Sequence, residues 1–218
     1  MRKYIAEFIG TFGLVFFGTG AIIVNEQTGG ALGHVGIAIT SGLVVLSMIY
    51  AFGEISGAHI NPAVTLGFAV ANRLDKKEVL PYIIAQIAGA FAATLILHVL
   101  FPANINLGTT LPAGSAIQSF IIEIILTYFL MMVIFNVSQG SKEVGVLAGI
   151  AIGSTILLEA MSIGPISGGS MNPARSLAPA IVSGNMSMLW IYLIAPFIGS
   201  GCAALTWLAM RPNPKSSF

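Results

Sequence analysis

Charged side chains are scarce in this sequence. Asp, Glu, Lys and Arg make up 8% of the 218 residues, whereas hydrophobic residues make up 56%. Soluble domains typically carry about 25% charged residues, so this composition excludes an ordinary soluble domain and indicates an integral membrane protein. The formal net charge of +1 gives no indication of a nucleic-acid partner.

Cysteine is almost absent as well. The single Cys202 has no partner for an internal disulfide, and because it lies in an apolar run we expect it to be a small buried side chain. The three histidines, His34, His59 and His98, are not spaced as metal ligands. We therefore expect neither a metal site nor another cofactor.

Long apolar runs dominate the chain. Each has roughly the 20 residues that an α-helix needs to cross the hydrocarbon layer. The six runs are Tyr4–Val24, Val35–Phe52, Val79–Leu100, Ile117–Val137, Val144–Ile163 and Met188–Met210. The first run is too long for the core of a signal peptide, so we expect it to be retained as a helix. The sequence predicts an all-α membrane protein with six spans and both termini on one side.

The basic residues predict the orientation. If both termini are cytoplasmic, eight of the nine Lys and Arg residues lie on the cytoplasmic side, as the positive-inside rule requires. The expected outer loops, residues 25–34 and 101–116, contain no Lys or Arg. We therefore expect a multi-pass protein of the cell membrane, plasma or inner, with cytoplasmic termini. Arg175 is the exception.

An internal repeat relates the two halves. Glu7 in "AEFIGTF" corresponds to Glu123 in "IIEIILTYF" at an offset of 116 residues, and two further motif pairs have offsets of 113 and 111. Each half contains three spans, and an odd number means that the halves enter the membrane from opposite faces. The sequence predicts a single domain, 1–218, built from inverted repeats of about 1–100 and 117–210.

The most specific repeated feature is an Asn-Pro-Ala triplet in each half. The triplets consist of Asn61, Pro62, Ala63, Asn172, Pro173 and Ala174. Proline suits the first position of a helix and asparagine suits the cap before it, so each triplet predicts a half-helix of about ten residues. Non-helical backbone at this depth is tolerable only where it lines a wet cavity. Two such half-helices, entering from opposite sides, predict a pore.

The junction of the half-helices has a defined chemistry. If each asparagine oxygen caps its own helix, the amide NH₂ faces outwards as a donor, and the positive ends of two helix dipoles converge. Such a site accepts a neutral molecule with a lone pair and repels protons and other cations. His59, beside the first triplet, is a further candidate for the pore lining.

Glu7 and Glu123 are expected to be buried at equivalent positions, where a charge is costly. They could form a proton relay, which would indicate a coupled transporter. They could instead accept hydrogen bonds from free N–H groups of the two re-entrant loops. The symmetry of the two positions favours this structural role.

The whole chain resembles the aquaporin, or major intrinsic protein, family. The resemblance rests on "AEFIGTF", "SGAHINPAVTLG", "EVLPYIIAQIAGA" and "SGGSMNPARSLAPA" and covers about 210 of the 218 residues. It implies the aquaporin fold, a right-handed bundle of six transmembrane helices with two re-entrant half-helices. It also implies a homotetramer in the lipid bilayer, with one pore per protomer. Arg175 corresponds to the arginine of the family's selectivity filter.

The resemblance also identifies the other filter positions as Ser41, Ala160 and Gly169. Water-selective members place Phe and His at the first two, and glycerol channels place aromatic residues at the first and third. Here all three residues are small, which resembles the metalloid-conducting nodulin-type intrinsic proteins. Gly168, next to this filter, is a possible lining residue. Ala160 and Glu159 are both unusual for the subgroup. Glu159 could displace Arg175, add an acceptor near the mouth, or only make loop contacts.

These features predict a passive channel, not an enzyme, with a wide filter. The expected permeants are silicic, boric and arsenous acid, together with glycerol, urea and water, which are neutral near pH 7. The alternatives are a water-selective or glycerol-selective aquaporin and, less in keeping with the sequence, a proton-coupled transporter. An intramembrane hydrolase would need a nucleophile beside a base, and Ser56 and His59 lack an orienting third group.

Overall fold

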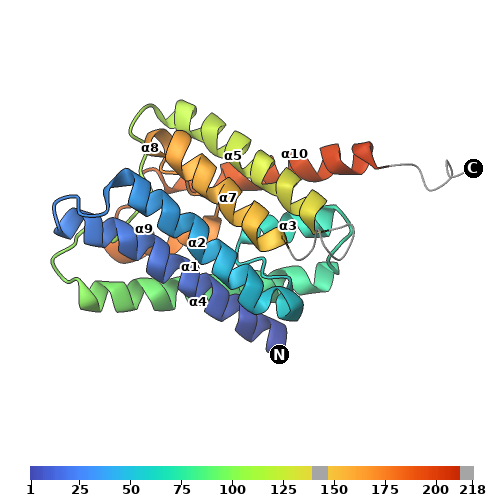
Figure 1. Ribbon diagram of the computed structural model, residues 1–218, viewed down its shortest axis with the longest axis horizontal. Helices are drawn as coiled ribbons and strands as arrows, with labels where there is room; N and C mark the ends of the chain where they lie inside the picture. The colour runs from blue at the N-terminus through green and yellow to red at the C-terminus, as the bar shows by residue number, and fades with distance from the viewer. Residues whose placement is uncertain (139–146, 212–218) are drawn as a thin grey trace, which may run out of the picture.

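Figure 1 shows a computed structural model of the protein, which describes residues 1–138 and 147–211. Those residues form helices connected by loops, with no strand among them. The helices are α1 (Arg2–Gln27), α2 (Gly33–Ser56), α3 (Pro62–Val70), α4 (Lys76–Leu100), α5 (Ala116–Val137), α7 (Ala148–Ser162), α8 (Gly164–Ser167), α9 (Pro173–Ser183) and α10 (Leu189–Met210). The all-α prediction is confirmed.

Five of these helices are long and apolar enough to cross a membrane: α1, α2, α4, α5 and α10. The predicted fifth span corresponds to α7, which has 15 residues within the described part of the chain. Its expected start at Val144 lies outside the described residues. Cys202, expected to be buried, is instead exposed on α10, because an apolar helix in a bundle also presents a face to the lipid.

The long helices run alternately up and down the bundle, and α3 and α9 enter it from opposite ends (Figure 1). Their packing follows the sequence repeat. Helix α1 packs on α4, and in the second half α5 packs on α10 in the same way. The half-helices pack across the halves, α3 on α10 and α9 on α4. The equivalent helices α2 and α7 pack on each other. This arrangement brings the beginnings of α3 and α9 together inside the bundle.

Glycines allow these helices to approach closely. A Cβ atom on Gly42 of α2 would lie 2.6 Å from the carbonyl oxygen of Gly153, and one on Gly153 of α7 would lie 2.7 Å from that of Gly42. A Cβ atom on Gly89 of α4 would lie 2.2 Å from a backbone oxygen of α1, and one on Gly199 of α10 would lie 2.3 Å from a backbone oxygen of α5. Small residues at such contacts let helix backbones pack closely in a membrane.

Candidate pore and selectivity filter

Each half-helix begins as its sequence predicts. Pro62 and Pro173 occupy the first turn of α3 and α9, and Asn61 and Asn172 are the caps. The Asn61 Oδ1 accepts a hydrogen bond from the Ala63 N–H at 2.8 Å. The Asn172 Oδ1 accepts from the Ala174 and Arg175 N–H groups at 3.0 and 3.4 Å. The two side-chain oxygens are therefore fixed, and the two NH₂ groups point away from their own helices.

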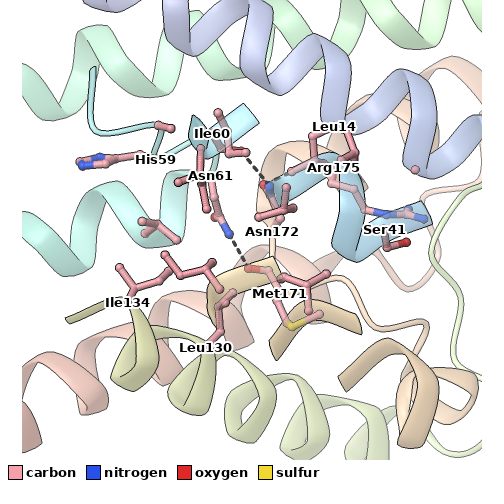
Figure 2. Close-up of a pocket in the computed structure, with 18 of the residues that line it drawn as sticks. Leu14, Ser41, His59, Ile60, Asn61, Leu130, Ile134, Met171, Asn172 and Arg175 are labelled. Carbon is pink, nitrogen blue, oxygen red and sulfur yellow. Dashed lines mark hydrogen bonds between the residues drawn. The ribbon is translucent and has the colours of Figure 1, made fainter. Parts of the chain in front are cut away.

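The two NH₂ groups cross between the re-entrant loops. Asn61 Nδ2 donates to the Met171 carbonyl at 2.8 Å, and Asn172 Nδ2 donates to the Ile60 carbonyl at 2.9 Å (Figure 2). Each contact uses one of the two N–H bonds of an amide. A second N–H on each asparagine thus remains to serve a molecule in the cavity.

The Glu7 carboxylate holds the first loop. Its Oε1 accepts from the Ser56 hydroxyl at 2.7 Å and the His59 N–H at 2.9 Å, and its Oε2 accepts from the Ile60 N–H and the Gln86 amide, both at 2.7 Å. The side chain is fully buried. These contacts support the structural role for Glu7 over the proton relay.

The Glu123 carboxylate holds the second loop in the same way. Its Oε1 accepts from the Ser167 hydroxyl and the Ser170 N–H, both at 2.9 Å, and its Oε2 accepts from the Met171 N–H at 2.7 Å. This side chain is also fully buried. The donors in the two loops occupy equivalent positions before their asparagines, so the repeat extends to individual hydrogen bonds.

The loops need this support because their backbone is strained. Ile60 and Met171 have φ values of +44° and +52°, in the left-handed region that is unfavourable for a residue with a side chain and most unfavourable for a β-branched one. The two residues in this conformation are the ones whose carbonyls accept from the asparagine of the other loop, Ile60 from Asn172 and Met171 from Asn61. Strain of this kind persists only where surrounding contacts fix it.

A cavity of about 1080 Å³ passes these loops. On α2 its lining extends from His34 to Glu54, a distance of about 30 Å along a helix. Asn61 and Asn172 line it between these ends. The cavity is therefore long enough to pass most of the way through the hydrocarbon layer.

The residues expected to form the filter all line this cavity. They are Ser41 from α2, Ala160 from α7, Gly169 from the loop before α9, and Arg175 from the first turn of α9. The Arg175 Nη1 donates to the Gly108 carbonyl at 2.9 Å and the Thr110 hydroxyl at 2.6 Å. No other partner holds its side chain among the described residues, so the remaining guanidinium donors are available to the cavity.

Three further residues were named as candidates beside the filter and the triplets: His59, Gly168 and Glu159. His59 and Gly168 line the cavity, and the His59 ring stacks on Phe68 with centroids 4.5 Å apart. Glu159 is buried and is not part of the cavity lining. Its Oε2 has no hydrogen-bond partner among the described residues, and the side-chain hydrogen bonds of Arg175 there go to Gly108 and Thr110, not to Glu159.

The family model for "Major intrinsic protein" matches residues 1–207. The chain belongs to this family. Aquaporin NIP1-1 of Zea mays is 44% identical over 99% of this chain and 77% of its own length. Nodulin-26 of Glycine max is 43% identical over 99% of this chain and 80% of its own length. The solved aquaglyceroporin from Plasmodium falciparum superposes with a TM-score of 0.87, at 29% identity, over 94% of both chains. The predicted aquaporin fold and the resemblance to nodulin-type intrinsic proteins are confirmed.

Some functional contacts of this major intrinsic protein were not predicted from its sequence. The Tyr82 hydroxyl donates to the Ser56 carbonyl at 2.9 Å, and the Tyr192 hydroxyl donates to the Ser167 carbonyl at 2.5 Å. Tyr82 and Tyr192 are 110 residues apart, and Ser56 and Ser167 are 111 apart, which is close to the offset of 111 between the two triplets. The repeat could therefore have revealed these two equivalent tyrosine–serine contacts. The contact of Thr110 with Arg175 has no counterpart in the repeat and gave no such signal.

We expect Glu123→Gln to retain most solute flux but to unfold at a lower temperature. The new NH₂ would face N–H or O–H donors, and losing a buried hydrogen bond costs about 1–3 kcal/mol, which for a chain of this size lowers Tm by at least about 2–4 °C. Thermal unfolding in detergent and flux in liposomes measure the two effects.

Glu26→Gln is the matched control, because Glu26 is exposed and its carboxylate accepts only from Asn104 in the described structure. It should unfold at the wild-type temperature. A folded Glu123→Gln protein that has lost all transport would contradict the bracing role and support a proton relay.

Proposed function

We propose that the protein is a passive channel for small neutral hydroxylated solutes, with a filter formed by Ser41, Ala160, Gly169 and Arg175. The candidate solutes are boric, silicic and arsenous acid, with glycerol, urea and water also passing. The observation that carries the proposal is that Arg175 lines the cavity together with these three small residues.

The small residues favour a wide opening. Ser41 also uses its hydroxyl to donate to the Ile37 carbonyl at 2.9 Å within α2, so its oxygen remains able to accept from a solute. The rings of Tyr50 and Phe68, which also line the cavity, come from the end of α2 and from α3, and the imidazoles of His34 and His59 line it as well. Because Ser41, Ala160 and Gly169 themselves carry no ring, they leave space beside Arg175 for a solute with several hydroxyl groups.

The polar groups favour a neutral solute. Arg175 and the two asparagine amides offer donors to the cavity, and the first turns of α3 and α9 add partial positive charge. A molecule that carries lone pairs and no net charge can accept from these donors, whereas a cation is repelled.

A proton-coupled transporter is less well supported. It would need a titratable group at the substrate site, and Glu54, near the end of α2, is the one carboxylate among the described residues that line the cavity. Glu7 and Glu123 are occupied by the loops. The relatives are an aquaporin and an aquaglyceroporin, and this similarity supports passage of water and glycerol.

The proposal extends to the assembly and its placement. We infer a homotetramer in the cell membrane with cytoplasmic termini, from the family resemblance and the distribution of basic residues. We also infer one domain of two inverted repeats, about 1–100 and 117–210, supported by the equivalent Glu7 and Glu123 contacts.

Wild-type protein in liposomes should transport boric acid, glycerol and urea well above protein-free liposomes, as measured by stopped-flow light scattering. Because no coupled proton is involved, collapsing the proton gradient with an uncoupler should leave these rates unchanged. Rates that depend on the gradient would indicate a transporter instead.

Ser41→Phe with Ala160→His should narrow the filter around an unchanged Arg175. The added rings occupy the space of a trigonal or tetrahedral solute but leave room for water, which needs about 2.8 Å, one hydrogen-bond length. We expect boric acid and glycerol fluxes to fall at least about tenfold, roughly 1.4 kcal/mol of added barrier, and water flux far less.

The two single variants serve as matched controls and should each give a partial effect. Protein content per liposome should be equal, and folding should be verified for each variant. If the folded double variant passes boric acid and glycerol at wild-type rates, the constriction lies elsewhere and the wide-filter proposal fails.

A further inference from the structure

A connected set of buried hydroxyl groups lies behind the filter arginine. The Thr110 hydroxyl accepts from Arg175 Nη1 and lies 2.8 Å from the Ser176 hydroxyl. The Ser176 hydroxyl in turn lies 2.6 Å from that of Ser170. Ser170 donates to the Asn172 carbonyl at 3.0 Å. All three hydroxyl residues are buried, at 5%, 1% and 6% exposure for Thr110, Ser176 and Ser170.

The two ends of this chain fix the direction of every bond in it. A guanidinium can only donate and a carbonyl can only accept, and each hydroxyl has one proton to donate. Because Ser170 gives its proton to the Asn172 carbonyl, Ser176 must donate to Ser170. Thr110 must then donate to Ser176, which leaves the Thr110 oxygen free to accept from Arg175.

Bonds aligned in one direction polarise one another and strengthen together. The hydroxyl chain therefore makes Thr110 a better acceptor than an isolated hydroxyl would be. It also connects two parts of the pore, because it begins at the filter arginine and ends at the asparagine that caps α9.

The loop that carries Thr110 is fixed independently of Arg175. Leu107 is 1% exposed and packs against Ile23 and Leu97. The neighbouring Thr109 contacts the Ser183 hydroxyl at 3.0 Å. Thr110 itself fills the space beside the cavity wall, since a Cβ atom on Gly168 would lie 2.4 Å from its methyl carbon. The loop thus presents a fixed acceptor to Arg175.

We propose that Thr110 is a positioning residue that sets the size selectivity of the filter, by holding the Arg175 guanidinium against the wall through the Thr110–Ser176–Ser170 hydroxyl chain. This inference rests on the proposed function. Both N–H bonds of Nη1 are used, one by the Gly108 carbonyl and one by Thr110. Without the hydroxyl, one of them must find an acceptor in the cavity, and the guanidinium then moves into the path of the solute.

Thr110→Val tests the proposal, because valine keeps the shape and removes the hydroxyl. We expect the ratio of boric acid to water permeability in liposomes to fall at least about threefold, since the displaced guanidinium hinders the larger solute more. Thr110→Ser retains the hydroxyl and should keep the wild-type ratio. A merely structural role would change Tm but not this ratio.

Thr109→Val is the matched control, because Thr109 lies in the same loop and bonds to Asn106 and Ser183 instead of Arg175. It removes contacts of the loop but leaves the Arg175–Thr110 bond in place, so it should lower Tm and keep the wild-type permeability ratio. If Thr110→Val does not fold, Ser176→Ala takes its place and should shift the ratio in the same direction, because it weakens Thr110 as an acceptor.

A folded Thr110→Val protein with the wild-type ratio would overturn the inference, as would a Thr110→Ser protein as impaired as Thr110→Val. If wild-type protein itself passes no boric acid, the proposed function fails separately. The inference is then judged by water permeability, which should be lower in Thr110→Val than in Thr110→Ser. Equal water permeability in the two variants would overturn the inference.

Discussion

The structure depends on satisfying backbone N–H groups where the two re-entrant loops end inside the membrane. Water is not available there to bond every exposed group, and each unsatisfied group costs several kcal/mol. Glu7 and Glu123 meet this need by accepting from consecutive N–H groups of the two loops. With the loop N–H groups bonded inward, the loops can keep their left-handed residues and present the Ile60 and Met171 carbonyls to the asparagines.

The chemistry of the pore follows from this arrangement. Because the two asparagines are held both by their own helices and by the opposite loop, their free N–H bonds have fixed directions. The same contacts bring the positive ends of α3 and α9 together at one level of the cavity. Arg175 adds a full charge in the first turn of α9, and Arg73, after α3, adds another to the cavity lining, so a permeant must pass several positive regions. Neutral solutes with lone pairs can do so at low cost.

The sequence was sufficient to predict the features that repeat. The triplets at Asn61 and Asn172, the paired glutamates and the apolar runs each have a local signature and a partner in the other half, which is why the fold could be predicted. The contacts of Arg175 with Gly108 and Thr110 could not be predicted, because the loop before α5 has no periodic sequence pattern and no equivalent in the first half. The exposure of Cys202 was predicted wrongly, because the sequence does not specify which helix faces point outwards.

The measurement that tests the account most directly is the proton permeability of liposomes containing Asn172→Asp protein. The carboxylate can still cap α9, but it replaces the donor that meets the Ile60 carbonyl at 2.9 Å with a negative charge. The account predicts a proton or cation leak at least about tenfold above wild type, with reduced flux of neutral solutes. Asn106→Asp, at an exposed position, should remain as tight as wild type. A folded Asn172→Asp protein that is equally proton-tight would contradict the claim that the asparagine junction excludes cations.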